Sequence, residues 1–266
     1  MNLISQILQE KRRNSTCALI PFLTAGYPNI TTTIEALYTL DKQGADIVEL
    51  GIPYSDALAD GPLIQQSSKV ALDQGIYIDQ VLGLLNQING NLNVPIVIFT
   101  YYNPILARGL NKFIKEISLL GVRGLIVPDL PIEETDYLIC ICRNYNIELV
   151  LFIAPTSPKS RIKNILSKAP GCVYLVSTTG VTGIRNHIND QIYDLASYIR
   201  SNTDKLVMLG FGISSPSQVS KISHWNIDGI VIGSAFTKIL SSQHCINNLK
   251  SFCFEIKQAI KTTDNH

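Results

Sequence analysis

The most constraining feature of the sequence is a repeated alternation of short apolar runs with segments of helical periodicity. Eight runs are continuously apolar, without the alternation of apolar and polar residues found in half-exposed strands. Such runs are typical of parallel strands that are covered on both faces. The expected strands are residues 17–22, 47–50, 95–102, 124–127, 148–153, 172–177, 206–209 and 229–232.

Helical segments separate most of these runs. After an N-terminal amphipathic segment, they are expected at residues 31–43, 62–72, 78–88, 112–120, 133–144, 158–168, 216–224, 234–240 and 246–261. Eight strand–helix units in about 250 residues is the pattern of a (β/α)8 barrel. A doubly wound open sheet is the competing architecture. We therefore predict an α/β fold, a single (β/α)8 TIM barrel with an extra N-terminal helix and a short helix after strand eight.

Composition supports one globular domain over residues 1–266, because no change in composition marks a boundary and 46% of the residues are hydrophobic. The formal net charge of +1 gives no electrostatic reason to expect nucleic acid or a membrane surface as a partner. The basic run Lys11–Arg13 is interpreted as a solvated helix end. The six cysteines are expected to be reduced core residues of an intracellular protein.

The N-terminal segment lacks the apolar stretch of a secretory signal and the pattern of a transit peptide. No apolar run approaches the ~20 residues that a membrane-spanning helix needs. We therefore expect a cytoplasmic or plastid-stromal protein.

Two carboxylates mark the candidate active site. Glu49 lies within the second apolar run, and Asp60 ends the loop that follows it. A buried acid is costly to ionise, so it is usually paired, neutralised or used in chemistry. Structural capping of a neighbouring loop is the alternative role of Glu49. In a barrel both acids would face the cavity at the carboxyl ends of the strands, where active sites of this fold lie. This arrangement suits acid–base catalysis.

Other side chains are expected at the same rim, although core packing is an alternative role for each aromatic one. They are Phe22, Thr24, Tyr102, Asp129, Thr156, Tyr174 and Ser177. Three later strand ends carry glycines, in Gly180–Gly183, in Gly210–Gly212 and at Gly233, which precedes Ser234. Glycine lets a ligand approach the backbone, and the short helix 234–240 presents free N–H groups at its start. Barrels often bind phosphate at this place.

The residues that are missing from the expected rim narrow the chemistry. No lysine lies at the carboxyl end of an expected strand, which disfavours a Schiff-base aldolase. The four histidines lie in loops, a helix end or the C-terminal tail, so neither a metal cluster nor a histidine-based triad is expected. What remains is a metal-free lyase or isomerase that uses carboxylates on a phosphorylated substrate.

These motifs resemble the α subunit of tryptophan synthase. The resemblance rests on segments that occur in family order along nearly the whole chain. They are Pro21-Phe-Leu-Thr-Ala-Gly-Tyr-Pro28, Glu49-Leu-Gly-Ile-Pro-Tyr-Ser-Asp-Ala-Leu-Ala-Asp-Gly61, Gly180-Val-Thr-Gly183, Gly210-Phe-Gly-Ile-Ser214 and Gly233-Ser234.

The resemblance implies retro-aldol cleavage of indole-3-glycerol phosphate to indole and glyceraldehyde 3-phosphate. Glu49 matches the family's general acid and base, and Asp60 matches the carboxylate that accepts the indole N–H. The remaining matches include a mobile-loop threonine, Thr182, and a backbone phosphate cradle. The resemblance implies Tyr174 and Thr182 as substrate-binding residues, and Phe22 and Tyr102 are expected beside them from their place at the rim. The implied phosphate-binding residues are Gly183, Gly212, Gly233 and Ser234.

Family members work in an α2β2 complex and pass indole to a pyridoxal-phosphate-dependent β subunit. The resemblance thus implies no cofactor in this chain, with pyridoxal phosphate in the partner, and an interface at Asp56 and Ala57. Ala57 departs from a common proline, and Ser177-Thr-Thr-Gly180 replaces a common Ser-Arg-Ala-Gly. Two alternatives stay open: a free-standing indole-glycerol-phosphate lyase, and a catalytically silent barrel that serves as a binding subunit.

Overall fold

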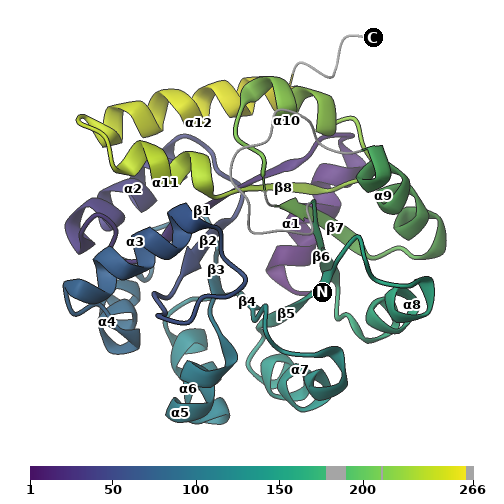
Figure 1. Cartoon of the computed structure of the whole chain (residues 1–266), viewed down its shortest axis with the longest axis horizontal. Coiled ribbons are helices and arrows are strands. Elements are labelled where there is room, and N and C mark those ends of the chain that lie inside the picture. Colours follow the sequence, from purple (N-terminus) through teal and green to yellow (C-terminus); the bar gives the residue numbers. More distant parts are fainter. Residues whose placement is uncertain (178–189, 211, 262–266) are drawn as a thin grey trace.

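Eight parallel strands close into a barrel (Figure 1). The structure is a computed structural model that describes residues 1–177, 190–210 and 212–261. Pairing of the first and last strands excludes an open doubly wound sheet and confirms the predicted barrel. The strands are β1 (Ala18–Thr24), β2 (Val48–Gly51), β3 (Ile96–Phe99), β4 (Gly124–Ile126), β5 (Glu148–Ile153), β6 (Cys172–Val176), β7 (Leu206–Gly210) and β8 (Gly229–Ile232).

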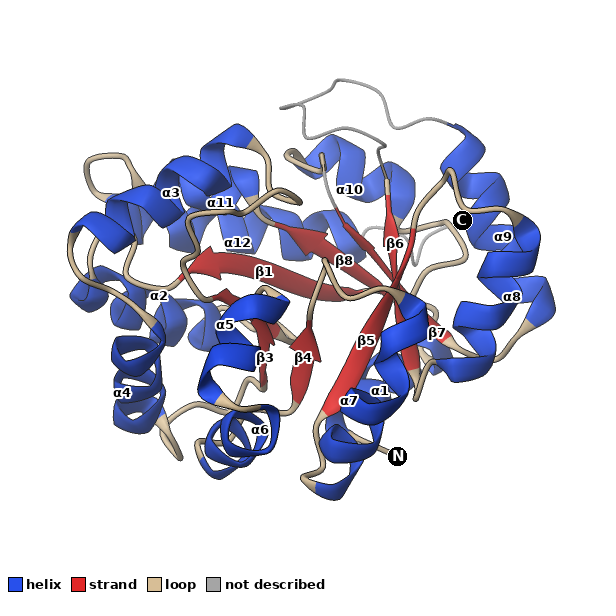
Figure 2. Cartoon of the chain, turned by 60° about the horizontal axis from the view of Figure 1, so that its bottom comes forward, coloured by secondary structure: helices blue, strands red, loops and turns tan. Residues whose placement is uncertain are grey.

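Helices surround the strands (Figure 2). Around the barrel run α2 (Ile30–Lys42), α3 (Pro62–Asp73), α4 (Ile78–Ile88), α5 (Tyr102–Arg108), α6 (Leu110–Leu119), the 3-10 turn η1 (Ile132–Glu134), α7 (Thr135–Asn144), α8 (Lys159–Lys168), α9 (Asp190–Asn202), α10 (Pro216–Ile222) and α12 (Cys245–Lys261). The two additional helices expected from the sequence are α1 (Leu3–Arg13) and α11 (Ser234–Leu240). None of the described helices is long and apolar enough to cross a membrane.

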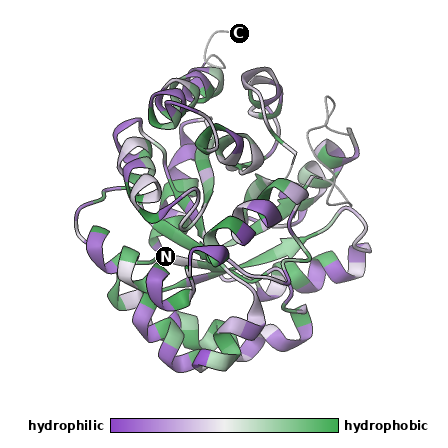
Figure 3. Cartoon of the chain, turned by 60° about the vertical axis from the view of Figure 1, so that its left-hand side comes forward, coloured by the Kyte–Doolittle hydropathy of each residue, from purple (hydrophilic) through white to green (hydrophobic). Residues whose placement is uncertain are grey.

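Alternate residues of each strand sort into two apolar layers. One layer fills the barrel and includes Phe22, Val97 and Tyr174, whereas the other lies between the strands and the helices and includes Leu23 and Leu50. Burial on both sides explains why the strands read as continuous apolar runs. In Figure 3 the strands carry mainly the hydrophobic colour, whereas the helices carry both the hydrophobic and the hydrophilic colour.

Helix α1 closes the amino-terminal end of the barrel. Ile4 and Leu8 are fully buried and join the interior apolar layer. Between them, the Ser5 hydroxyl donates to both carboxylate oxygens of Glu148, at 2.6 and 2.7 Å. The backbone N–H of Cys172 donates to the same carboxylate at 2.8 Å. A buried acid at this end is therefore fully engaged in structure, in contrast to the acid on β2.

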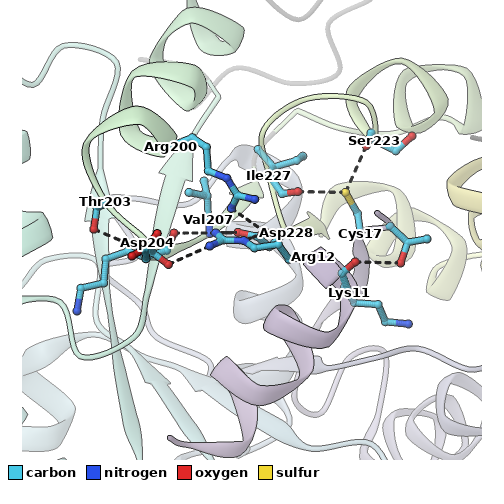
Figure 4. Close-up of polar contacts among 12 residues, drawn as sticks. Lys11, Arg12, Cys17, Arg200, Thr203, Asp204, Val207, Ser223, Ile227 and Asp228 are labelled. Atoms are coloured by element: carbon cyan, nitrogen blue, oxygen red, sulfur yellow. Dashed lines mark hydrogen bonds and ion pairs between the residues drawn. The ribbon is translucent and has the colours of Figure 1, made fainter. Parts of the chain in front are cut away.

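Two of the three basic residues at the end of α1 are engaged in ion pairs, which corrects the interpretation of Lys11–Arg13 in part, since only Arg13 is exposed. Nε and Nη2 of Arg12 donate to the two carboxylate oxygens of buried Asp228, both at 2.7 Å. Figure 4 shows Arg12 and Arg200 both directed at Asp228. Lys11 lies 2.7 Å from a carboxylate oxygen of Asp46. The ion pairs anchor α1 to the barrel, a tertiary role that a local run of basic residues does not reveal.

The third strand is shorter than expected. It ends at Phe99 instead of residue 102, and Tyr102 begins helix α5. The side chain of Asp129, which follows β4, accepts the Tyr102 N–H at 2.9 Å and so caps this helix from a neighbouring loop. The cysteine prediction is also wrong in part, because Cys140 is exposed and Cys245 is half-buried.

Candidate active site

Glu49 projects from β2 into the barrel. It pairs in register with Phe22 of β1 and with Val97 of β3, both of which belong to the interior layer. The residue is only 2% exposed, and its Oε2 has no hydrogen-bond partner in the described structure. A buried polar atom without a partner is unusual and often marks a functional group.

Asp60 ends the loop between β2 and α3 and is 7% exposed. Two contacts hold this loop in place. The Gln65 side chain on α3 donates to the carbonyl oxygens of Ala57 at 3.1 Å and Asp60 at 2.9 Å. The Ala59 N–H donates to the hydroxyl of Tyr101 at 3.0 Å. The loop is thus fixed directly beside Asp60, so its carboxylate has a defined position.

Both carboxyls favour the protonated form more than an exposed acid does. Burial, with a smaller contribution from the charge of Asp60, raises the pKa of Glu49 to about 8. Burial also raises the pKa of Asp60 to about 7, opposed by a hydrogen bond from Tyr101. The electrostatic coupling recorded between the two acids places them in one site. Near neutral pH, Glu49 therefore holds its proton more firmly than Asp60 does.

Aromatic side chains line the interior near these acids. Phe22 meets Phe99 edge-on with 5.7 Å between ring centroids, and Phe99 meets Tyr101 edge-on at 6.2 Å. Tyr174 packs on Phe152 at 4.8 Å. Burial and the charges of Glu49 and Asp60 raise the pKa of Tyr174, which places its hydroxyl in the same electrostatic environment. These rings form an apolar wall suited to a flat aromatic ligand.

Two glycines make room for the aromatic rings. A Cβ on Gly210 would lie 2.0 Å from the Tyr174 hydroxyl, and a Cβ on Gly51 would lie 2.7 Å from the Phe22 ring. Glycine at position 210 is therefore needed for Tyr174 to lie across the end of β7. Packing alone accounts for this glycine, which the sequence had suggested as part of a phosphate loop.

The predicted phosphate-binding residues are described in part. Gly212 has a φ of 77°, which favours glycine, and Gly233 caps the start of α11, where Ser234 is the first helical residue. Gly233 also lies beside Phe22, since its Cβ would come 3.4 Å from that ring. Thr182 and Gly183 lie outside the described residues.

Tyr102 does not join the interior aromatic wall. It is half-buried on α5 and packs against the outer apolar layer. Its neighbour Tyr101 takes the inward position, being 3% exposed and part of the interior layer. Sequence reasoning missed Tyr101. The alternation of inward residues along the strand, through Val97 and Phe99, was the signal that could have found it.

The two residues predicted to contact a partner differ in exposure. Asp56 is exposed, but Ala57 is only 4% exposed and packs with the interior layer. The following residue, Leu58, is 85% exposed. The loop therefore presents an apolar side chain to solvent two residues before Asp60.

Comparisons with known proteins show which sequences and structures the chain is similar to. The sequence model of the family "Tryptophan synthase alpha chain" matches residues 8–261. The tryptophan synthase alpha chain of Gracilaria tenuistipitata var. liui is 58% identical, over 100% of this chain and 99% of that protein.

Solved structures agree as well. A Mycobacterium tuberculosis tryptophan synthase structure superposes with a TM-score of 0.90 at 29% identity, covering 97% of this chain and 98% of that one. A chain of the Pyrococcus furiosus tryptophan synthase complex gives a TM-score of 0.84 at 33% identity, covering 91% and 98%. Matched in sequence and in structure over nearly its whole length, the chain belongs to the tryptophan synthase alpha chain family.

Proposed function

We propose that Glu49 and Asp60 carry out the reaction of this family, the retro-aldol cleavage of indole-3-glycerol phosphate to indole and glyceraldehyde 3-phosphate. The observation that carries the proposal is the pair of buried, coupled carboxyls at the carboxyl ends of the strands. Burial raises both pKa values to near neutral pH, to about 8 for Glu49 and about 7 for Asp60. Carboxyls with pKa values near the working pH suit acid–base catalysis.

Glu49 begins the cycle as the acid, because its raised pKa keeps it protonated near neutral pH. It gives its proton to C3 of the indole, which creates an indolenine with positive charge at the ring nitrogen. The Glu49 carboxylate then takes the proton of the hydroxyl on the adjacent side-chain carbon. That carbon becomes the aldehyde of glyceraldehyde 3-phosphate, the bond to C3 breaks, and its electron pair returns to the ring. Glu49 is protonated again at the end.

Asp60 serves this cycle as an anion. Its carboxylate accepts the indole N–H and stabilises the positive charge that develops on the ring nitrogen. The lower pKa of Asp60 relative to Glu49 supports this division, since the more acidic group is the one that remains ionised. The missing hydrogen-bond partner of Glu49 Oε2 supports its role as the group that exchanges a proton with substrate.

The remaining substrate contacts are also proposals. The aromatic wall supports indole contacts from Phe22 and Tyr174. Thr182 keeps the substrate-binding role that the resemblance implies, and Tyr102 keeps the role expected from its place at the rim. A backbone cradle at Gly183, Gly212, Gly233 and Ser234 would hold the phosphate, supported by the start of α11, which has no side-chain cap.

We also propose that the chain assembles with a β subunit, in an α2β2 complex in which pyridoxal phosphate belongs to the partner. The structure from Pyrococcus furiosus, described as a tryptophan synthase complex, supports a partner of this kind. The loop carrying Asp56 and Ala57 is the proposed contact, and the exposure of Leu58 suggests that Leu58 provides its apolar surface. The chain is further proposed to be a single domain that works in the cytoplasm or the plastid stroma.

Indole release from indole-3-glycerol phosphate tests this function directly. The wild-type chain is assayed alone and with a tryptophan synthase β subunit, and we expect slow release alone and strong stimulation in the complex. Equal release in both conditions would identify a free-standing lyase. A chain that binds the β subunit yet releases no indole in the complex would identify a silent binding subunit. Either result would contradict the proposed partner-dependent activity.

A further inference from the structure

Tyr101 connects the loop of Asp60 to the barrel. It follows β3, and its side chain is buried against rings of two different segments. Tyr54, from the same loop as Asp60, lies 5.1 Å away between ring centroids, and Phe99 of β3 lies 6.2 Å away. Because both sides of the ring are packed, the direction of the hydroxyl is fixed.

The hydroxyl of Tyr101 has two neighbours that differ in character. It accepts the Ala59 N–H at 3.0 Å, and Ala59 immediately precedes Asp60. A phenol that accepts one hydrogen bond still has its own proton to donate. Asp60, the next residue after Ala59, is the acid whose pKa this hydroxyl lowers.

We propose that Tyr101 is a positioning residue for the catalytic reaction: it takes the Ala59 N–H and donates to Asp60, which keeps that carboxylate ionised and directed at the indole N–H. Tyr101 acts through Asp60 and need not touch the substrate. This inference rests on the proposed function of Asp60. The sequence pattern did not identify it, since it favoured Tyr102, whose side chain packs on the outer layer.

The surroundings of Asp60 explain why such a donor is required. Glu49 on β2 and Tyr174 on β6 face Asp60, whose charge raises the pKa of both. The charge of Asp129, which follows β4, contributes to the raised pKa of Tyr101. Burial favours a protonated Asp60, and a neutral carboxyl is a weaker acceptor for the indole N–H than a carboxylate is. The Tyr101 hydrogen bond acts in the opposite direction and lowers the pKa of Asp60. Tyr101 itself stays protonated, because burial and the charge of Asp60 raise its pKa.

The pH dependence of kcat/KM in the complex with the β subunit tests this proposal. Tyr101→Phe removes the hydroxyl and keeps the ring, so the pKa of Asp60 should rise. We expect the acid limb of the profile to move to higher pH by about one pH unit, the size of a lost hydrogen bond to a charged group. Because Glu49 must also hold its proton and its pKa is about 8, the maximum of the profile should fall as the acid limb approaches the alkaline limb. Tyr54→Phe removes a hydroxyl from the adjoining ring and should leave the acid limb in place.

A second substitution gives a result in the opposite direction. Placing 3-fluorotyrosine at position 101 makes the phenol a stronger donor, so the acid limb should move to lower pH. A loss of activity by the same factor at every pH in Tyr101→Phe would mean that the hydroxyl serves packing alone. Movement of the limb in the same direction for both substitutions would also overturn the proposal.

A titration without turnover separates this inference from the proposed function. The side-chain carboxyl of Asp60 is followed by 13C NMR in wild-type and Tyr101→Phe chains labelled at aspartate, with Asp60→Asn to assign the signal. A higher pKa in Tyr101→Phe supports the positioning role even if no indole is released by the wild type. An unchanged Asp60 titration refutes the positioning role while leaving the lyase function standing.

Discussion

Replacing Glu49 with glutamine is expected to stabilise the folded chain at alkaline pH. In the folded chain burial raises the pKa of Glu49 from 4.5 to about 8. Below pH 4.5 the acid is protonated in the folded and unfolded states alike. Between pH 4.5 and 8 it ionises in the unfolded chain but keeps its proton in the folded one, so stability falls as the pH rises through this window. Above pH 8 the loss is complete.

The size of the effect follows from the two pKa values. A difference of one pH unit corresponds to about 1.4 kcal/mol, so ionising Glu49 lowers the free energy of unfolding by up to roughly 5 kcal/mol. Glutamine resembles the protonated acid and does not ionise. Glu49→Gln should therefore match the wild type near pH 4.5 and exceed it increasingly toward pH 8.5.

Urea unfolding at pH 5, 6.5 and 8.5 measures this difference. Glu255→Gln, at an exposed position on α12, controls for the loss of one formal negative charge. An advantage of Glu49→Gln that is the same at all three pH values would refute the reasoning. Lower stability of Glu49→Gln than of the wild type at pH 8.5 would refute it as well, since it would mean that the ionised acid is stabilised by the fold.

Three further predictions concern packing and assembly. Arg12→Met leaves the buried Asp228 carboxylate without its bidentate partner, so the free energy of unfolding measured in urea should fall by roughly 3–5 kcal/mol. A decrease below about 1 kcal/mol would contradict an anchoring role. Gly210→Ala places a Cβ 2.0 Å from the Tyr174 hydroxyl, so kcat/KM should fall at least about tenfold, a barrier increase of about 1.4 kcal/mol. An unchanged kcat/KM would argue against the clash, since the added Cβ also meets the carbon atoms of the Tyr174 ring. Leu58→Asp puts a charge on the exposed loop, so half-maximal stimulation of indole release should need at least about tenfold more β subunit. An unchanged titration would exclude Leu58 from the interface.

Local patterns in the sequence were sufficient to predict the barrel and the positions of Glu49 and Asp60 in it. Each strand is buried on both faces, so each appears as a continuous apolar run, and counting the runs predicts the architecture. Glu49 stands out because it interrupts such a run. Once the barrel is assumed, its place at the carboxyl end of β2 follows without knowledge of any contact.

Features that depend on contacts between distant segments could not be predicted in this way. Helix α5 begins at Tyr102 because Asp129 from a different loop accepts its N–H, and this cap is absent from the local sequence. The ion pair of Arg12 joins residues 216 positions apart. The contact of Tyr101 with Ala59, 42 positions away, could not be predicted either, although the alternation along β3 could have indicated that Tyr101 points inward.

Loop geometry likewise required the structure. In the loop between β2 and α3, two hydrogen bonds from Gln65 turn the backbone so that Ala57 faces inward and Leu58 faces solvent. Sequence alone had placed the partner contact on Asp56 and Ala57. The apolar exposure at Leu58 became visible only when the side chains were placed.

The turnover of Glu49→Gln in the complex with the β subunit tests the central claim most directly. We expect indole release to be abolished, because glutamine can neither give a proton to C3 nor take one from the hydroxyl, while a substrate analogue lacking that hydroxyl still binds with near wild-type affinity. Asp60→Asn should retain more activity, since it weakens charge stabilisation without removing the proton carrier. Near-normal indole release by Glu49→Gln would contradict the assignment of Glu49 as the acid and base of this site.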